Sequence, residues 1–470
     1  VGCGSDDSNF NYGYYNPGGG NNPGVLAPVA VADSFSVLGG GTLTGSVTAN
    51  DTVNGATVTA FQNPSTSGGT VAVTAGGQLT YTPPTGQANI SDTFTYTLNN
   101  SGGSSTATVT VAVGARGFFV KNDVAATGSG AQTSPFKTLL EATTAAASTP
   151  GAQIVVFRGD GTSTGHNVPV TLAANQAILA QDPASQPTIS GPISLASNTT
   201  LSNLRLVGTT GGDAVIGTGI VGATLSNLTI ANTTANGVNM TNPTGTLTMT
   251  GLNFGNIGRA AFPLNMNAGT LTIAASNWTA TNTIGNVSEA VVSGNAVVSG
   301  NFNQLSFSQV GAQNPIPNSG TGFEWETFNT SNVTLRTTGY TFNSGSNAIY
   351  FTSRDSSSTA VLVSGAIVSG GTSEGIYLTG AGSSSLKSRI VNSVLTGNVQ
   401  GFRADAIANA AVCLRLLGNT SDRFNFGGIS TIPIMVENLS SLSGPDNIGA
   451  TNATGSVSGA ALDSCGIPSI

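Results

Sequence analysis

Apolar and hydroxyl-bearing residues alternate in short runs through the first quarter of the chain. Between about residues 29 and 113 these runs read DSFSV, TLTGSV, GATVTAF, GTVAVT, GQLTYTP, DTFTYTL and TATVTVAV, with turn residues between them. Alternation with a period of two buries one face of a strand, and turn signals about every 8 to 12 residues are typical of a two-sheet sandwich. The pattern therefore predicts an all-β sandwich in this region.

A second pattern is a long repeat. The segment TLSNLRLVGTT at 200–210 returns as TLSNLTIANTT at 224–234, with seven of eleven letters unchanged and an offset of 24. Related apolar segments follow near 246, 270, 296, 333, 360, 386, 412 and 434, mostly 22 to 27 residues apart. A period in the twenties indicates one unit stacked on the next. Leucine-rich repeats share this period, but their longer apolar motif and helix signal are missing. We expect a parallel β-helix of roughly eleven coils, each about 4.8 Å from the next.

Equivalent residues of successive coils should stack on one another. The spacing predicts an internal asparagine ladder at Asn203, Asn227, Asn253, Asn277 and Asn303. The residues that directly follow four of these predict a hydrophobic stack: Leu204, Leu228, Phe254 and Trp278.

Two segments resemble known families. The succession AVADSFSV, TAND, GGTVAVTAGGQLTYTPP, SDTFTYTL and ATVTV resembles the cadherin-like, bacterial immunoglobulin-like domains of surface adhesins. Such domains usually serve as spacers, and some bind calcium through acidic residues at their ends. The resemblance implies a possible calcium site at the matching positions Asp33, Asn50, Asp51 and Asp92.

The segment GFFVKNDVAATGSGAQTSPFKTLLEATTAA, followed by GAQIVVFRGDGT, resembles the entry of the pectate-lyase-like superfamily of right-handed parallel β-helices. The resemblance implies a strand, a Gly-rich loop, an amphipathic helix and the first coil. The residues agree independently, because Thr133 or Ser134 can cap a helix and Pro135 suits its first turn. We expect a helix at about 134–147 that covers the open end of the solenoid, with an apolar face formed by Phe136, Leu139, Leu140 and Ala147.

These observations predict four parts in an all-β chain: a low-complexity tail (1–28), an Ig-like sandwich (29–114), the parallel β-helix (115–450) and a C-terminal segment (451–470). The tail is too rich in Gly, Asn and Pro to fold alone, so one interpretation is a flexible tether. Phe10, Tyr12 and Tyr14 alternate with polar or Gly residues, so this part of the tail, together with Tyr15, could instead form a strand that adds to another subunit during assembly.

Charge and cysteine content narrow the functional classes. Only 7% of residues are charged and the net charge is −7, so no basic face is available for nucleic acid. No apolar run approaches the length of a transmembrane helix. Cys413 and Cys465 lie near the C-terminus and could pair, whereas Cys3 is either a free thiol or a lipid attachment site, since VGC resembles the end of a bacterial lipobox. Export fits such cysteine use.

The best candidate for chemistry is a charged cluster with one tryptophan. Glu324, Trp325 and Glu326 occupy a long insertion, and Arg354 and Asp355 follow one coil later. The phrases AIYFTSRD, GIYLTG and GFRADA then place Glu374, Arg403 and Asp405 at similar positions. Functionally, Trp325 would stack on a sugar while a carboxylate acts as acid or base. Structurally, the same groups would be exposed ion pairs. The lone His166 is expected at the surface of a polar loop.

From residue 154 onward the chain has no paired aspartates and no Asp-x-Asp motif. The leading hypothesis is therefore a secreted or surface-anchored bacterial structural protein that is not an enzyme: a self-assembling filament subunit or an adhesin. Its partners would be other copies of itself or cell-surface glycans, with calcium as the one possible cofactor. The alternative is a polysaccharide-binding or polysaccharide-degrading β-helix protein, such as a lyase, a glycosidase or a tailspike-like depolymerase.

Overall fold

The computed structural model describes residues 24–209, 211–311, 320–437, 447–453, 457–460 and 464–468. The chain forms two compact units, which divide between Gly114 and Ala115. The candidate assembly residues Phe10, Tyr12, Tyr14 and Tyr15 and the candidate lipid site Cys3 lie outside the described residues.

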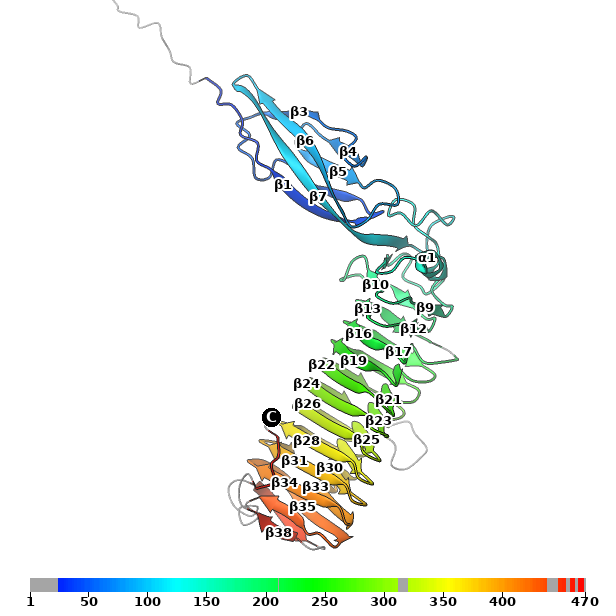
Figure 1. The fold of residues 1–470 in the computed structure, drawn as a ribbon, viewed down its shortest axis with the longest axis vertical. Coiled ribbons are helices and arrows are strands. Elements are labelled where there is room, and N and C mark those ends of the chain that lie inside the picture. The colour runs from blue at the N-terminus through cyan, green and yellow to red at the C-terminus, as the bar shows by residue number, and fades with distance from the viewer. Residues whose placement is uncertain are drawn as a thin grey trace, which may run out of the picture. The chain divides into compact units, whose positions relative to one another are not determined.

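The first unit is an antiparallel β-sandwich, as the alternating pattern predicts (Figure 1). One sheet has the order β1–β7–β6–β3, and the other has the order β2–β5–β4. Inward residues of the long strands, such as Phe94 and Tyr96 of β6 and Val109 and Val111 of β7, are buried between the sheets. The strands are β1 (Asp33–Gly39), β2 (Leu43–Ser46), β3 (Thr57–Phe61), β4 (Thr70–Val73), β5 (Gln78–Thr82), β6 (Ile90–Asn100) and β7 (Gly103–Val120).

One short helix is found among the described residues, α1 (Leu139–Ala146), and it packs against the first coils of the second unit. Its N-cap is Thr138, which forms a capping box with Glu141, so the predicted cap at Thr133 or Ser134 is wrong. The preceding residues are held in an extended conformation, because Phe136 N donates to Phe119 O (2.8 Å) and Phe136 O accepts from Lys121 N (2.8 Å). The helix therefore begins five residues later than expected.

The predicted apolar face of this helix is also partly wrong, since Leu140 is 46% exposed. The buried face consists of Leu139, Ala142, Thr143 and Ala146. Thr143 tolerates burial because its hydroxyl donates to Leu139 O at 3.1 Å.

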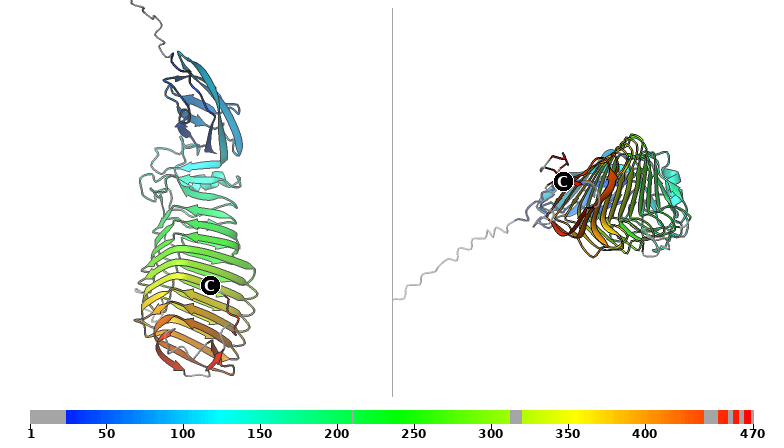
Figure 2. Two further views of the ribbon diagram at one scale, coloured as in Figure 1. Left: turned by 90° about the vertical axis from the view of Figure 1, so that its left-hand side faces the viewer. Right: turned by 90° about the horizontal axis from the view of Figure 1, so that it is seen from below.

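The second unit is a parallel β-solenoid of about eleven turns, which confirms the predicted fold class. Figures 1 and 2 show its coils stacked one above another. Each coil contributes to three parallel sheets, which we call sheets A, B and C in the order in which a coil visits them.

Sheet A contains the end of β7, β8 (Gln153–Val156), β10 (Ala177–Ala180), β13 (Thr199–Ser202), β16 (Val221–Ser226), β19 (Thr244–Thr250), β28 (Ser358–Ser364), β31 (Ser385–Val391), β34 (Ala411–Leu417), β36 (Ile434–Glu437) and β38 (Val457–Ala460). Sheet B contains β11 (Thr188–Ile189), β14 (Arg205–Val207), β17 (Thr229–Thr233), β20 (Asn253–Ile257), β29 (Ile367–Gly371) and β32 (Val394–Leu395). Three long strands bend from sheet A into sheet B: β22 (Thr270–Thr281), β24 (Val297–Ser308) and β26 (Asn332–Gly345).

Sheet C contains β9 (Val170–Thr171), β12 (Ile193–Leu195), β15 (Val215–Thr218), β18 (Val238–Thr241), β21 (Phe262–Met266), β23 (Ser288–Val292), β25 (Phe323–Thr327), β27 (Ile349–Ser353), β30 (Glu374–Gly380) and β33 (Gln400–Ala408). β35 (Asn419–Ser430) pairs with β32 of sheet B and β33 of sheet C, and β37 (Asn447–Ala453) pairs with β35.

Apolar residues from all three sheets fill the interior of the solenoid in one continuous core. The members of the predicted hydrophobic stack are all buried. Phe254, however, pairs in register with Ile230 and therefore does not continue the stack of Leu204 and Leu228. The place predicted for Phe254 is taken by Leu252, which is also buried. Leu252 follows the corner residue Gly251, just as Leu228 follows Asn227.

The predicted internal asparagine ladder is wrong in position. Asn203, Asn227 and Asn277 lie at the outer corner between sheets A and B, where each adopts a left-handed conformation with φ of 59°, 51° and 56°. Asparagine and glycine tolerate this region best, and Gly251 (φ 66°) fills the place between Asn227 and Asn277. The amide of Asn227 donates to Asn203 Oδ1 at 3.2 Å, so two of the predicted residues do bond from coil to coil, at the outer corner.

The remaining two asparagines of the predicted ladder belong to neighbouring positions. Asn253 is the first residue of β20 and accepts from Thr279 Oγ1 (2.9 Å). Asn303 pairs in register with Ser276. The corner position of that coil is instead taken by Gln304, with φ 54°.

Candidate functional site

The strand register brings the predicted charged residues together on the outer face of sheet C. One outer column runs Glu289, Glu324, Tyr350, Tyr377 and Arg403, from β23 to β33. The adjacent outer column runs Val291, Glu326, Thr352, Thr379 and Asp405. Neighbouring members of a column are separated by about 4.8 Å, the spacing of paired strands.

Trp325 does not belong to this face, which corrects the prediction that it stacks on a sugar. The alternation in β25 turns Phe323, Trp325 and Thr327 inward, and Trp325 is 0% exposed. Its indole N–H donates to Ser288 Oγ at 3.0 Å, and its ring packs on Phe351 at a centroid distance of 5.8 Å. Trp325 is therefore a core residue, and the alternation in FEWET already carries that signal.

Three carboxylates cluster at one end of the columns: Glu289, Glu324 and Glu326, which we call the carboxylate row. The side-chain amide of Asn286 lies 2.8 Å from Glu324 Oε2 and 3.5 Å from Glu289 Oε2, so it draws these two carboxylates together. Burial and the charges of Glu289 and Glu326 raise the pKa of Glu324, against a hydrogen bond from Asn286 that lowers it. Glu289, in contrast, is exposed.

The third carboxylate is engaged by an arginine. Glu326 Oε1 lies 3.5 Å from Arg354 Nη2, and the guanidinium also lies over the Phe328 ring at 5.7 Å. Asp355 forms no ion pair with this arginine: it lies in the turn after β27 with φ 56°, and its carboxylate accepts from Asn329 N at 3.0 Å. Asp355 therefore shapes the turn rather than the carboxylate row.

The other end of the columns combines aromatic and charged groups. Tyr350 and Tyr377 stack with a centroid distance of 5.1 Å and an interplanar angle of 16°. Tyr377 donates its hydroxyl to Asp405 Oδ2 (2.8 Å), and burial together with this carboxylate raises the pKa of Tyr377 to about 12. Arg403 joins Asp405 (2.7 Å) to Glu374 (3.3 Å) and lies over the Tyr377 ring at 4.8 Å. Sequence reasoning missed both tyrosines as well as Glu289 and Asn286.

A hollow of about 200 Å³ adjoins the carboxylate row. Val291, one of its lining residues, pairs in register with Glu326 of the carboxylate row. The remaining lining residues are three asparagines, two hydroxyl residues and a methionine: Asn242, Asn265, Asn267, Thr241, Ser293 and Met266. The outer face of sheet C thus offers carboxylates, amides and aromatic rings over several successive coils.

The candidate calcium residues are only partly brought together. Asp33, Asn50 and Asp51 are neighbours, and burial together with the Asp51 charge raises the pKa of Asp33 to about 6. Asp92 lies elsewhere, because its carboxylate accepts from Ser67 N (2.8 Å) and from the Tyr81 hydroxyl (2.6 Å). The predicted four-residue set is therefore not assembled. Within the described ranges no group of three His, Cys, Asp or Glu side chains is arranged to hold a metal ion.

His166 is not the surface residue that the sequence predicts. It is 1% exposed, and both ring nitrogens lack a hydrogen-bond partner among the described residues. Backbone hydrogen bonds of His166 fix the loop that contains it: His166 N donates to Ser163 O (2.8 Å), and His166 O accepts from Gly191 N (2.9 Å). Burial lowers the pKa of the imidazole, so the ring is neutral at pH 7.

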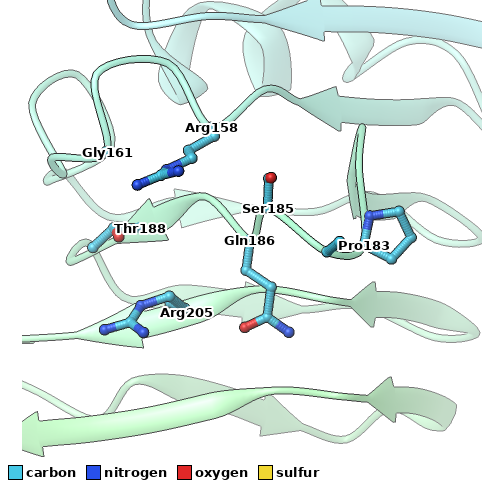
Figure 3. Close-up of a pocket in the computed structure, with 8 residues that line it drawn as sticks. Arg158, Gly161, Pro183, Ser185, Gln186, Thr188 and Arg205 are labelled. Carbon is cyan, nitrogen blue, oxygen red and sulfur yellow. The ribbon is translucent and has the colours of Figure 1, made fainter.

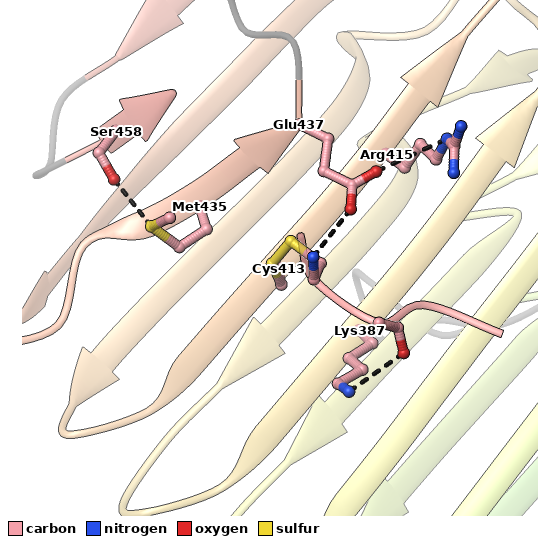
Figure 4. Close-up of a disulfide and its surroundings, with 8 residues drawn as sticks. Lys387, Cys413, Arg415, Met435, Glu437 and Ser458 are labelled. Atoms are coloured by element: carbon pink, nitrogen blue, oxygen red, sulfur yellow. Dashed lines mark hydrogen bonds and ion pairs between the residues drawn. A yellow bond between two sulfur atoms is a disulfide. The ribbon is translucent and has the colours of Figure 1, made fainter. Parts of the chain in front are cut away.

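The structure contains the disulfide between Cys413 and Cys465, with a Cα–Cα distance of 5.9 Å. Figure 4 shows the surroundings of this bond. Cys465 N donates to Glu437 Oε1 (2.9 Å), and Lys387 Nζ donates to Gly466 O (3.2 Å). The segment around Cys465 is thereby fastened to the outer surface of sheet A.

Comparison with known proteins agrees with this architecture. Residues 26–112 match the family described as Bacterial Ig domain. No curated protein sequence matches the chain. Among solved structures, the catalytic unit of a thermostable GH87 alpha-1,3-glucanase from Streptomyces thermodiastaticus is similar at 14% identity, with 83% of this chain and 76% of that chain covered and a TM-score of 0.34.

A second similar structure is the catalytic domain of a GH87 alpha-1,3-glucanase in complex with tetrasaccharides. It shows 12% identity, covers 83% of this chain and 75% of that chain, and has a TM-score of 0.35. The prediction that this chain is not an enzyme is overturned by the comparison, because both structures are catalytic parts of glycoside hydrolases. At these identities and TM-scores the likeness assigns no activity to this chain, so the chemistry has to come from this chain's own residues.

A bacterial Ig domain is consistent with an extracellular protein. In the described part of the chain, no helix has the length and apolar character that crossing a bilayer requires.

Proposed function

We propose that the solenoid binds and hydrolyses a neutral polysaccharide on the outer face of sheet C. The observation that carries this proposal is the pair formed by Glu289 and Glu324, which face each other from adjacent coils and share the amide of Asn286. Glycosidases need two carboxyl groups beside the scissile bond, one that donates a proton and one that acts as a base or nucleophile.

The environments of the two carboxyl groups assign their roles. Glu324 is half-buried and its pKa is raised, so it retains a proton longer and suits the general acid. Glu289 is exposed and suits the group that attacks the anomeric carbon. Their strands lie about 4.8 Å apart and one amide group contacts both carboxylates, which favours the roughly 5–5.5 Å carboxyl separation of retaining enzymes over the wider separation of inverting enzymes.

In the first step, Glu324 would protonate the glycosidic oxygen while Glu289 forms an ester with the anomeric carbon and the leaving sugar departs. In the second step, Glu324 would take a proton from water, which attacks the anomeric carbon and releases Glu289. Asn286, which contacts both carboxylates, would hold them at the required separation. Glu326 is held by Arg354 and is a positioning residue in this scheme.

The charge of the face favours an uncharged substrate. The columns and their surroundings carry the carboxylates of Glu289, Glu324, Glu326, Glu374 and Asp405, which would repel a uronate-rich chain. Tyr350 and Tyr377 supply an aromatic surface for sugar rings, and the amides of the adjoining hollow match sugar hydroxyls. We infer that a glucan or a similar neutral chain runs along the coils, from this hollow past the carboxylate row to the tyrosines.

The test is the release of reducing ends from a panel of neutral polysaccharides, which includes alpha-1,3-glucan because the similar structures are named for it. Glu324→Gln and Glu289→Gln should each lower the rate by about two orders of magnitude or more, the typical contribution of an acid–base group. Asp123→Asn, which removes an exposed carboxylate paired with Lys121 (3.4 Å) near the helical cap, is the matched control and should keep the rate. Equal activity of both glutamine variants and the wild type would refute the assignment.

We also infer that the protein works outside the cytoplasm, as the Cys413–Cys465 disulfide favours an oxidising compartment. Growth of the producing cells followed by assay of the medium and the cell surface tests this point. A protein confined to the reducing cytoplasm would contradict it.

A further inference from the structure

A separate hollow lies on the first coils of the solenoid, beside sheet B rather than sheet C. It has a volume of about 610 Å³, within the range of small-molecule sites. Its walls come from three successive coils: the loop after β8, the turn before β11, and the start of β14. The lining residues are Arg158, Gly161, Pro183, Ala184, Ser185, Gln186, Thr188 and Arg205.

Two arginines dominate this hollow, which we call the arginine hollow. Figure 3 shows the guanidinium groups of Arg158 and Arg205 on the same side, with Thr188 between them. No ion pair of either arginine occurs among the described residues, and none of the eight lining residues is acidic. The two guanidinium groups thus open on one hollow of a chain whose net charge is −7. Their positive charge is thus available to a ligand.

The surrounding backbone holds the hollow in shape before any ligand arrives. Asp160 Oδ1 accepts from Asn122 Nδ2 (2.7 Å) and Thr162 N (2.8 Å), which fixes the loop that carries Arg158. Gly161 closes the turn with φ 81°, and its N–H donates to Arg158 O at 3.1 Å.

The opposite wall is fixed in a similar way. Ser185 N donates to Asp182 O (3.0 Å), and Gln186 Nε2 donates to Asn227 O (3.1 Å). Thr188 pairs in register with Arg205, which places the two about one strand spacing apart. A ligand would therefore enter a site whose polar groups already converge.

We propose that the arginine hollow binds an acidic sugar of a polysaccharide through its carboxylate. Arginine presents donors in a planar fork that matches a carboxylate with two parallel hydrogen bonds. Ser185, Gln186 and Thr188 provide the hydroxyl and amide groups that match the ring hydroxyls of a sugar, and the volume exceeds what a lone anion needs. The site lies beside a different sheet from the carboxylate row, so binding there does not depend on the proposed hydrolysis.

The experiment is calorimetric titration of the full chain with three probes: a trigalacturonate, a neutral galactotriose, and inorganic sulfate. The expected result is binding of trigalacturonate, at least tenfold weaker binding of galactotriose, and at least tenfold weaker binding of sulfate. Arg158→Gln and Arg205→Gln should each weaken trigalacturonate binding by roughly tenfold or more, since each removes a charge-assisted pair.

Arg336→Gln is the matched control, because Arg336 lies on β26, outside the hollow, and should leave binding unchanged. Glu324→Gln should also bind trigalacturonate like the wild type, which separates this proposal from the proposed hydrolysis. Equal binding of the acidic and neutral trisaccharides would overturn the proposal, as would full binding by the double arginine variant. Sulfate binding as tight as that of trigalacturonate would overturn the assignment to a sugar and leave a simple anion site.

Discussion

Trp325→Phe distinguishes a core tryptophan from a sugar-stacking one. The phenyl ring retains part of the contact with Phe351 but loses the indole hydrogen bond to Ser288 Oγ. Ser288 is 0% exposed, so its hydroxyl would be left without water, at a cost of about 1–3 kcal/mol. The smaller ring adds a cavity term, and we expect a total loss of about 2–4 kcal/mol in the free energy of unfolding.

Urea unfolding followed by tryptophan fluorescence measures this loss. The chain has two tryptophans, so the variant leaves Trp278, which is also buried in the solenoid, as the only indole reporter. With a denaturant slope of roughly 3–6 kcal/mol/M for a unit of this size, the midpoint should fall by about 0.3–1.3 M.

Binding to neutral glycans should survive the same substitution under native conditions, because no atom of Trp325 reaches the outer face. Tyr377→Phe is the matched control, since it removes an outer hydroxyl bonded to Asp405. It should weaken glycan binding and have a smaller effect on unfolding. An unchanged midpoint together with lost binding in Trp325→Phe would refute the reasoning.

Three further predictions concern stability. The pKa of His166 is lowered in the folded state, so the unfolded chain takes up the proton first and the stability of the solenoid should fall as the pH drops below about 6.5. His166→Leu should flatten this pH dependence in tryptophan-monitored urea unfolding. The same pH dependence in the variant and the wild type would contradict the prediction. Asn227 has φ 51°, so Asn227→Gly should be nearly neutral and Asn227→Val should cost about 1–2 kcal/mol in the same assay, whereas equal costs would argue against a left-handed corner. Reduction of the Cys413–Cys465 disulfide, which spans 52 residues, should destabilise the C-terminal coils by up to about 4 kcal/mol by the chain-entropy relation. Amide hydrogen exchange in β34 and β36 should then be faster. Unchanged exchange rates would refute a structural role of the disulfide.

The sequence predicts the solenoid well because each coil buries apolar side chains at equivalent positions. A residue that faces the core at one coil must be followed by an apolar residue one period later, which is why Leu204, Leu228 and Trp278 could be assigned to the interior. The sandwich is predicted equally well, since period-two alternation in β6 and β7 separates buried from exposed side chains.

The asparagine ladder was misplaced because spacing alone does not show which way a side chain points. A repeated asparagine can be an internal amide stack or a left-handed corner, and both give the same period. Gly251 in place of the expected asparagine was the available signal, since glycine shares a preference for positive φ but provides no amide.

The candidate site was predicted only in part for a similar reason. Glu324 and Glu326 were identified from their charge, but their partners Glu289 and Asn286 lie in the preceding coil, on the other side of the long insertion. The arginine hollow was not predicted at all. Arg158 and Arg205 are far apart in the sequence, and only the stacking of three coils brings them to one hollow.

The most direct test of the central claim is a proton NMR time course of the wild-type protein with neutral glucan oligosaccharides. We predict new reducing ends whose first-formed anomer has the configuration of the cleaved bond, as the close spacing of Glu289 and Glu324 requires. Glu324→Gln should release almost none of them from the same substrate. Inverted product would contradict the pairing of these two carboxylates, and the absence of any cleavage across the neutral panel would contradict the proposed hydrolysis itself.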